Sequence, residues 1–141
     1  MNLDHLGEPG RIMELWQAAS IAQSLRAMEE IFDDDAIYEF PFTAAGFPSR
    51  IDGKKAIVAF LSATWSTGLI VYDRYETIAA YRAKDDPGVV IVEQDVYGTS
   101  SAAGDFILPN LIVAQIENGR IEKLRDYANL LAASQALGMR I

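Results

Sequence analysis

Cysteine is absent from the 141-residue sequence, and histidine occurs once, as His5. Without cysteine the chain cannot form disulfides, thiolate nucleophiles or cysteine-ligated metal centres. A zinc centre built from several histidines is excluded as well. A Ser-His-Asp triad is disfavoured because the single imidazole lies in a polar N-terminal segment. We therefore expect a protein that works without a metal or any other cofactor.

Clusters of basic residues and long apolar runs are also missing. The densest basic pair is Lys54-Lys55, and the formal net charge is −8. Binding to nucleic acid needs clustered Lys and Arg, so that partner is not expected. No apolar run approaches the ~20 residues that span a bilayer. Residues 1–5 lack the basic start and apolar stretch of a signal peptide. We expect a cytoplasmic protein with no nucleic-acid or membrane partner.

What is present describes one ordinary globular domain. Half of the residues are hydrophobic, and no repeat, linker or low-complexity tract interrupts the chain. A chain of this length can bury a sizeable core without disulfides or structural metal ions. We therefore treat residues 1–141 as a single domain.

The hydrophobic periodicity predicts helices first and strands later. A helix is expected from Pro9, a restart at a capping box formed by Ser20 and Gln23, and a third helix from Asp52-Gly53. Strands are expected over Ala36–Phe42, Leu69–Arg82, Val89–Thr99, Asp105–Glu117 and Arg120–Asn129, with a short helix over Leu130–Leu137. This order predicts an α+β fold in which the N-terminal helices pack on a strongly curved, mostly antiparallel sheet. Such a cone has a mouth that can hold a ligand.

A charged residue in the last predicted strand is the strongest functional signal. Asp126 lies within Arg125-Asp126-Tyr127, and charged side chains are rare in apolar strands unless they are paired, exposed or chemically used. Asp126 could act as an acid or a base inside the cup. The alternative is a surface ion pair with Arg125 or Lys123, which contributes little to stability.

Strand alternation divides residues 89–97 into two faces. We expect the set ending in Glu93, Asp95 and Tyr97 to face the cup. The other set should pack against a helix layer or another subunit; it consists of Val90, Val92, Gln94 and Val96. If Asp95 and Asp126 share the cup, their proximity raises at least one pKa and suits acid–base catalysis. A solvated face for Glu93 and Asp95 is the open alternative.

Further candidates come from the first strand and from the aromatic residues. Tyr38 could donate a hydrogen bond to an oxyanion, and its neighbour Glu39 could abstract a proton, but adjacent strand residues cannot both face inward. Asn110, an amide in an apolar run, could contact a ligand or cap a strand edge. The large aromatic residues are expected to pack in the core, with some lining an apolar pocket; they are Trp16, Phe42, Phe47, Trp65 and Phe106.

Two blocks of sequence resemble the nuclear transport factor 2-like superfamily, in particular its ketosteroid isomerase-like and SnoaL-like polyketide cyclase branch. The first block covers residues 31–42 and continues over residues 51–57; the second covers residues 118–121 and 124–129. The order of the elements between them also matches. The resemblance implies the cone-shaped fold across nearly the whole chain. Proteins of this superfamily include isomerases, cyclases, hydrolases, dehydratases and proteins without catalytic activity.

The family's functional residues carry over to this sequence only in part. Phe40 stands where ketosteroid isomerases have their general base, and their acidic oxyanion donor falls near Asn110 or Ile112. The resemblance to limonene-epoxide hydrolases places two acids at Asp95 and Asp126, but Glu93 replaces the linking arginine. Phenazine-biosynthesis and polyketide-cyclase relatives have an acid or base at the Asp126 position.

Together these observations predict binding of a small hydrophobic, oxygenated metabolite and cofactor-free cyclisation, isomerisation or dehydration. Asp126 is the expected acid or base, and Asp95 would either tune Asp126 or position a water. Tyr38 and Asn110 would orient a substrate carbonyl. The expected pocket lining consists of Glu93, Tyr97, Asn110, Phe40, Trp65, Trp16 and Ile112. The alternatives are a non-catalytic binding or dimerisation module and an epoxide hydrolase. A homodimer would form through the sheet exterior, with Val90, Val92, Val96 and Tyr127 in the interface.

Overall fold

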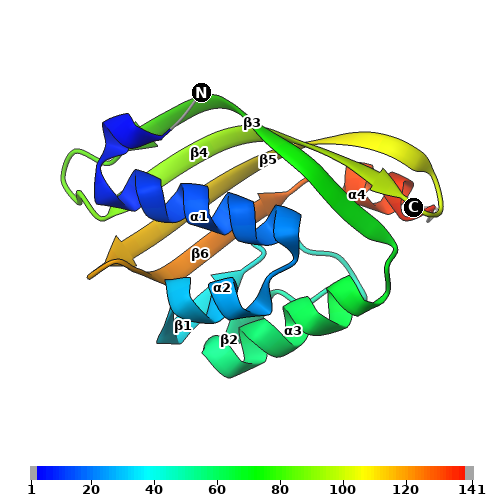
Figure 1. Cartoon of the computed structure of the whole chain (residues 1–141), viewed down its shortest axis with the longest axis horizontal. Helices are drawn as coiled ribbons and strands as arrows, with labels where there is room; N and C mark the ends of the chain where they lie inside the picture. The colour runs from blue at the N-terminus through cyan, green and yellow to red at the C-terminus, as the bar shows by residue number, and fades with distance from the viewer. Residues whose placement is uncertain (1–2, 139–141) are drawn as a thin grey trace.

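A computed structural model describes residues 3–138 and shows helices packed on a single curved sheet (Figure 1). The helical elements are a 3-10 helix over Asp4–Leu6, α1 over Glu8–Ala22, α2 over Leu25–Ile31, α3 over Lys54–Ser66 and α4 over Leu130–Ala136. The strands are β1 over Phe32–Glu39, β2 over Arg50–Asp52, β3 over Ile70–Arg82, β4 over Val89–Ser100, β5 over Gly104–Glu117 and β6 over Arg120–Ala128. Among these residues no helix is long and apolar enough to cross a bilayer.

The six strands form one sheet in the order β2-β1-β6-β5-β4-β3. The pair β1–β6 is parallel and every other pair is antiparallel. The helix α1 crosses one face of the sheet, while α2 and α3 lie beside β1 (Figure 1). The predicted α+β cone, with N-terminal helices on a mostly antiparallel sheet, is confirmed.

The second helix begins four residues later than predicted, with its N-cap at Ser24 instead of Ser20. Helix α1 continues through Ser20, whose hydroxyl donates to the Trp16 carbonyl at 2.9 Å. It ends at Ala22, and the following residue, Gln23, adopts a left-handed conformation with φ of 51°. Ser24 caps α2 by accepting a hydrogen bond from the Ala27 amide at 3.1 Å. Serine hydroxyls can bond to the preceding turn as well as cap a new helix, so the sequence pattern alone did not separate the two sites.

The first strand begins earlier than predicted and ends before Pro41. The triplet 33–35 belongs to β1 instead of ending a helix, and β1 stops at Glu39. The three-residue strand β2 lies between the first predicted strand and the third predicted helix, where no strand was predicted, and it pairs with β1 in the register Tyr38↔Ile51. An ion pair of 3.2 Å joins Lys54 at the start of α3 to Asp34. Strand β2 is too short for a pattern of alternation to reveal it.

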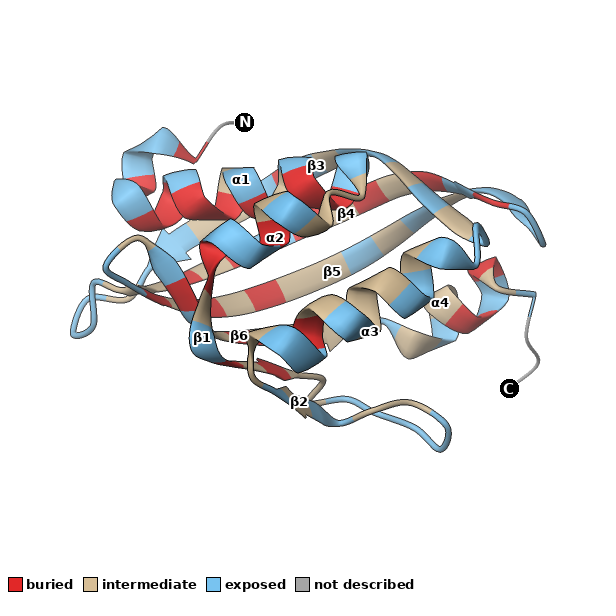
Figure 2. Ribbon diagram, turned by 60° about the horizontal axis from the view of Figure 1, so that its bottom comes forward, coloured by how far each residue is buried: buried red, intermediate tan, exposed pale blue. Residues whose placement is uncertain are grey.

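The core lies between α1 and the concave face of the sheet, where the buried residues of both concentrate (Figure 2). Ile12, Met13 and Trp16 contribute from α1, and the sheet contributes Val90, Val92, Ile112, Ala114 and Leu124. The valine-rich set of β4 therefore faces the helices. The set that contains Glu93, Asp95 and Tyr97 is on the convex face, because successive strand residues point to opposite sides.

Candidate functional site

A cavity of about 540 Å³ opens between the concave face of the sheet, α3, α4 and the loop that follows β1. Its volume is in the range of small-molecule sites. Aromatic and aliphatic side chains form most of the wall, and the aromatic ones are Trp16, Tyr38, Phe40, Phe47, Phe60, Trp65, Tyr72 and Tyr75. Within residues 3–138, Asp126 is the one charged side chain that lines it.

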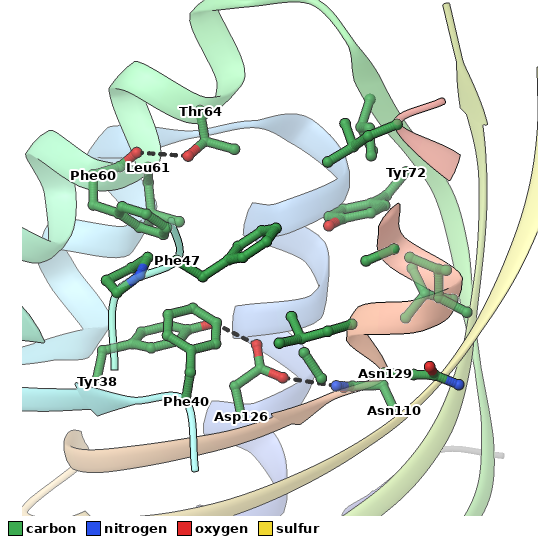
Figure 3. A pocket seen from close by; sticks show the side chains of 18 of the residues that line it. Tyr38, Phe40, Phe47, Phe60, Leu61, Thr64, Tyr72, Asn110, Asp126 and Asn129 are labelled. Carbon is green, nitrogen blue, oxygen red and sulfur yellow. Dashed lines mark hydrogen bonds between the residues drawn. The ribbon is translucent and has the colours of Figure 1, made fainter. Parts of the chain in front are cut away.

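Asp126 projects from β6 into this cavity, and each of its carboxylate oxygens accepts a hydrogen bond (Figure 3). The Tyr38 hydroxyl, from β1, donates to Oδ2 at 2.7 Å. The Asn110 side-chain amide, from β5, donates to Oδ1 at 2.7 Å. Since a carboxylate oxygen can accept more than one hydrogen bond, Asp126 keeps acceptor capacity for a ligand.

A chain of side-chain amides leads from α1 to this carboxylate. Gln17 Nε2 donates to Gln94 Oε1 at 2.8 Å, and Gln94 Nε2 donates to Asn110 Oδ1 at 2.8 Å. Gln94 is 1% exposed, so its amide needs both partners. Each amide donates toward Asp126, so the chain orients Asn110 with its NH₂ group on the carboxylate. The strand register makes this possible. Gln94 is paired with Asn110, and Asn110 with Ala128, which is two residues from Asp126 on the same face of β6.

Burial raises the pKa of Asp126 above its ordinary value, and the hydrogen bonds from Tyr38 and Asn110 oppose this rise. The pKa of Tyr38 is raised well above its ordinary value by burial and, secondly, by the negative charge of Asp126. Tyr38 therefore remains a donor. A carboxyl group with a raised pKa is better able to exchange a proton with a bound organic molecule than an exposed one.

The structure does not bring Asp95 to Asp126. Asp95 is paired with Glu76 of β3 and Pro109 of β5 on the convex face, while Asp126 faces the cavity. The predicted pair of carboxylates is therefore wrong. Glu93 and Tyr97 share the convex face with Asp95, and the Arg74 guanidinium lies 3.6 Å from the Tyr97 ring centroid. The reason is the hydrophobic effect. The more apolar face of β4 packs against the helices, which leaves the face with Glu93, Asp95 and Tyr97 on the convex side.

The other expected site residues lie at or near the cavity. Tyr38, Phe40, Trp16, Trp65 and Asn110 line it. Ile112 is completely buried in the core, opposite Asp126 in the register of β5 and β6. Glu39 points to the other side of β1 and forms an ion pair with Lys123 at 2.9 Å. Asp126 bonds to Tyr38 and Asn110, so the expected alternative of a surface ion pair does not describe it.

Sequence reasoning missed Gln17, Gln94, Tyr72 and Tyr75. Gln94 had a signal, because it is the one amide in a strand face otherwise made of valines. Tyr72 and Tyr75 are three residues apart, so simple alternation would place them on opposite faces. A register shift between Tyr72 and Arg74 places both tyrosines on the cavity wall instead. Bulges of this kind leave no clear mark in the sequence.

Comparison with known proteins places this site in a familiar fold. No family model matches the sequence. The sequence is 28% identical to the uncharacterized protein YesE of Bacillus subtilis (strain 168) over 124 residues, which are 87% of this chain and 82% of YesE. A solved structure from Bacillus subtilis, of a protein proposed to be an isomerase, aligns with a TM-score of 0.86 and 26% identity, covering 100% of this chain and 99% of the other. A Catenulispora acidiphila protein with a ketosteroid isomerase-like fold, in complex with trimethylamine, aligns with a TM-score of 0.72 and 21% identity, covering 92% and 93%.

Other similar structures have names from the same superfamily. They include a SnoaL-like polyketide cyclase of Shewanella putrefaciens, an NTF-2-like protein of Burkholderia xenovorans and an epoxide hydrolase of M. tuberculosis that resembles limonene-epoxide hydrolases. These matches are 15–21% identical and show the fold alone. The expected resemblance is confirmed: the chain has the nuclear transport factor 2-like fold, in the form found in ketosteroid isomerase-like and SnoaL-like proteins.

Proposed function

We propose that this protein catalyses cofactor-free acid–base chemistry on a small, neutral, mostly apolar molecule that contains oxygen, with Asp126 as the acid or base. The observation that carries the proposal is the enclosed carboxyl of Asp126, held through both oxygens in an otherwise uncharged cavity. Such a carboxyl is costly to bury unless it is used or fully paired. Asp126 is bonded by neutral donors only, so no cation holds it in the ionised form.

The chemistry follows from the raised pKa and the fixed position of the carboxyl group. With a ketone ligand, the Asp126 carboxylate would take a proton from the carbon next to the carbonyl. The C–H bond breaks, its electron pair moves into an enolate, and the proton resides on Asp126. Return of the proton to another carbon gives isomerisation. In dehydration the enolate electron pair forms a C=C bond as the C–O bond to a β-hydroxyl group breaks, and the proton on Asp126 lets that group leave as water. Tyr38 and Asn110 would hold the carboxyl at one position throughout these steps.

The similar structures support this reading as an analogy of fold. One is of a protein proposed to be an isomerase, and another is named a SnoaL-like polyketide cyclase. A shared fold does not specify a reaction. The proposal therefore depends on the residues of the site.

Deuterium exchange tests the proposal without knowledge of the natural substrate. The neutral ketone 2-tetralone, dissolved in D₂O with the protein, is followed by proton NMR. We expect α-protons to be lost faster than in buffer, and we expect Asp126→Asn to return the rate to that of buffer. Asp95→Asn is the matched control, because Asp95 lies on the convex face and should leave the rate unchanged. Equal rates for the wild type and Asp126→Asn would contradict the proposal.

Epoxide opening is the less favoured chemistry. Limonene-epoxide hydrolases link their two acids through an arginine, and Glu93 stands in its place here. No Lys, Arg or His side chain lines the cavity within the described residues. Arg125 neighbours Asp126 in β6 and therefore points to the opposite face. A purely ligand-binding role is also less favoured, because it leaves the buried titratable group without a use.

We also propose that the convex face of the sheet joins two copies of this chain. The three valines of the predicted interface are on the concave face, Val90 and Val92 in the core and Val96 in the cavity wall, so this part of the prediction is wrong. Tyr127, the fourth predicted residue, is on the convex face with Glu93. The convex face instead exposes Tyr81 and Ile107, at 60% and 54%.

Charge complementarity supports a second copy as the occupant. The Nε atom of Arg125 is buried on this face and has no acceptor among residues 3–138. Glu93, on the same face, forms no ion pair in that part of the chain. A two-fold axis could bring Glu93 of one copy to Arg125 of the other. Sedimentation equilibrium should show a dimer at micromolar concentration, weakened by Arg125→Leu; a wild-type monomer would contradict the interface.

A further inference from the structure

Tyr72 presents an unused hydrogen-bond donor to the cavity. Its side chain comes from β3 and lies across the cavity from Asp126, with the hydroxyl directed toward the interior (Figure 3). That hydroxyl forms no hydrogen bond with any residue in the described part of the chain. Tyr38 and Asn110, in contrast, both bond to Asp126. The cavity therefore has one polar end whose groups bond to one another, and Tyr72 adds a hydroxyl that is free to meet a ligand.

The orientation of Tyr72 is built into the surrounding wall. Its ring contacts Tyr75 with centroids 6.1 Å apart and Phe106 with centroids 6.3 Å apart. Phe106 in turn lies over Gly98, where a Cβ atom would come within 2.5 Å of the phenyl Cζ. The glycine makes room for Phe106, and Phe106 supports Tyr72. A hydroxyl fixed in this way loses little entropy when it bonds to a ligand.

We propose that the Tyr72 hydroxyl donates a hydrogen bond to an acceptor oxygen of the ligand, while another polar group of the same ligand meets Asp126. This inference rests on the proposed function and adds the substrate class. The ligand has two oxygen functions at opposite ends of an apolar body. The acceptor is a neutral carbonyl, as in a ketone, lactone or ester. Carboxylates and phosphates are disfavoured because Asp126 is the one charged side chain lining the cavity within residues 3–138, and it is acidic.

The protonation state of Tyr72 suits this role. Burial raises the pKa of Tyr72 to about 12, and the negative charge of Asp126 contributes in the same direction. The hydroxyl therefore keeps its proton over the whole range in which Asp126 titrates. Tyr72 can therefore donate to the acceptor oxygen of the ligand whether Asp126 is protonated or ionised.

Two fluorescent phenols separate the two ends of the cavity. 7-Hydroxycoumarin has a phenol and a lactone carbonyl at opposite ends, while 2-naphthol has the phenol alone. Both are titrated with protein at a pH where the phenols are neutral. We expect Tyr72→Phe to weaken 7-hydroxycoumarin about 3- to 10-fold, the usual effect of one hydrogen bond. Its affinity for 2-naphthol should stay unchanged.

Tyr75→Phe is the matched control, because Tyr75 lines the same cavity and its hydroxyl already interacts with Ser20. It should leave both affinities unchanged. The inference is overturned if Tyr72→Phe leaves the 7-hydroxycoumarin affinity intact, if it weakens both probes equally, or if wild-type protein does not bind 7-hydroxycoumarin. Since the titration measures binding alone, it can succeed even where deuterium exchange fails, and the two proposals are judged separately.

Discussion

Removing the Tyr38 hydroxyl is the most informative test of how the buried carboxyl is held. Tyr38 is 5% exposed, and its hydroxyl lies 2.7 Å from Asp126 Oδ2. Tyr38→Phe keeps the ring and its packing on Phe40, at a centroid distance of 4.9 Å. The variant therefore removes one hydrogen bond and little else. A hydrogen bond to a charged group contributes about 1.5–3 kcal/mol, and one to a neutral group about 0.5–1.5 kcal/mol.

The free energy of unfolding should show this difference in a double-mutant cycle. At pH 7, Tyr38→Phe should cost about 1.5–3 kcal/mol in the wild type but about 0.5–1.5 kcal/mol in the Asp126→Asn background. The side-chain amide introduced by Asp126→Asn can accept from Asn110 and donate to Tyr38, so that background keeps a bonded site. Urea unfolding, followed through the fluorescence of Trp16 and Trp65, measures all four proteins.

The pH dependence of the cycle has a definite sign. The pKa of Asp126 is raised in the folded protein. As pH rises from about 4, the unfolded chain therefore loses this proton first, and stability falls until the folded carboxyl has also ionised. The hydrogen bond from Tyr38 lowers the pKa of Asp126 in the folded protein. Without this bond, the free energy of unfolding falls over a wider range of pH. Tyr38→Phe should cost more at pH 7 than at pH 4. An equal cost in both backgrounds, or at both pH values, would refute the reasoning.

Three further variants test other parts of the account. Asp126→Asn removes the fall in stability described above, so urea midpoints of this variant should change less between pH 4 and pH 7 than those of the wild type. Gln94→Leu leaves Asn110 Oδ1 without its donor and should lower the free energy of unfolding by about 1–3 kcal/mol. It should also move the acidic limb of the pH profile of deuterium exchange to higher pH. An unmoved limb would show that the amide chain does not act on Asp126. Gly98→Ala places a Cβ atom 2.5 Å from the Val71 carbonyl oxygen and from Phe106, so it should lower thermal stability by about 1–3 kcal/mol; an unchanged melting temperature would contradict the packing.

Much of the fold could be predicted from periodicity and turns. The four long strands begin and end within a residue or two of their predicted bounds, because residue patterns and turn sequences such as Asn118-Gly119 delimit them. The start of α3 after Asp52-Gly53 was predicted for similar reasons. Strand β2 was not, because three residues paired only along one edge contain too little pattern.

The candidate site could be predicted only in part. Asp126, Tyr38 and Asn110 each stood out alone, as polar residues in apolar runs, but their mutual hydrogen bonds depend on strand order. Alternation divides β4 into two faces without saying which one meets the helices, and the choice of Asp95 over Gln94 followed from that ambiguity. The face with more valines is the one that turned toward the helices. Tyr72 needed the register shift beside it, which depends on tertiary packing.

A pH titration of the Asp126 carboxyl tests the central claim most directly. Protein containing ¹³C-labelled aspartate is followed by NMR, and the resonance missing in Asp126→Asn identifies the group. The account predicts a midpoint above the ~3.9 of an unperturbed aspartate, moving higher still in Tyr38→Phe. A midpoint at or below that value would mean that burial does not outweigh the hydrogen bonds from Tyr38 and Asn110, and the proposed chemistry would lose its basis.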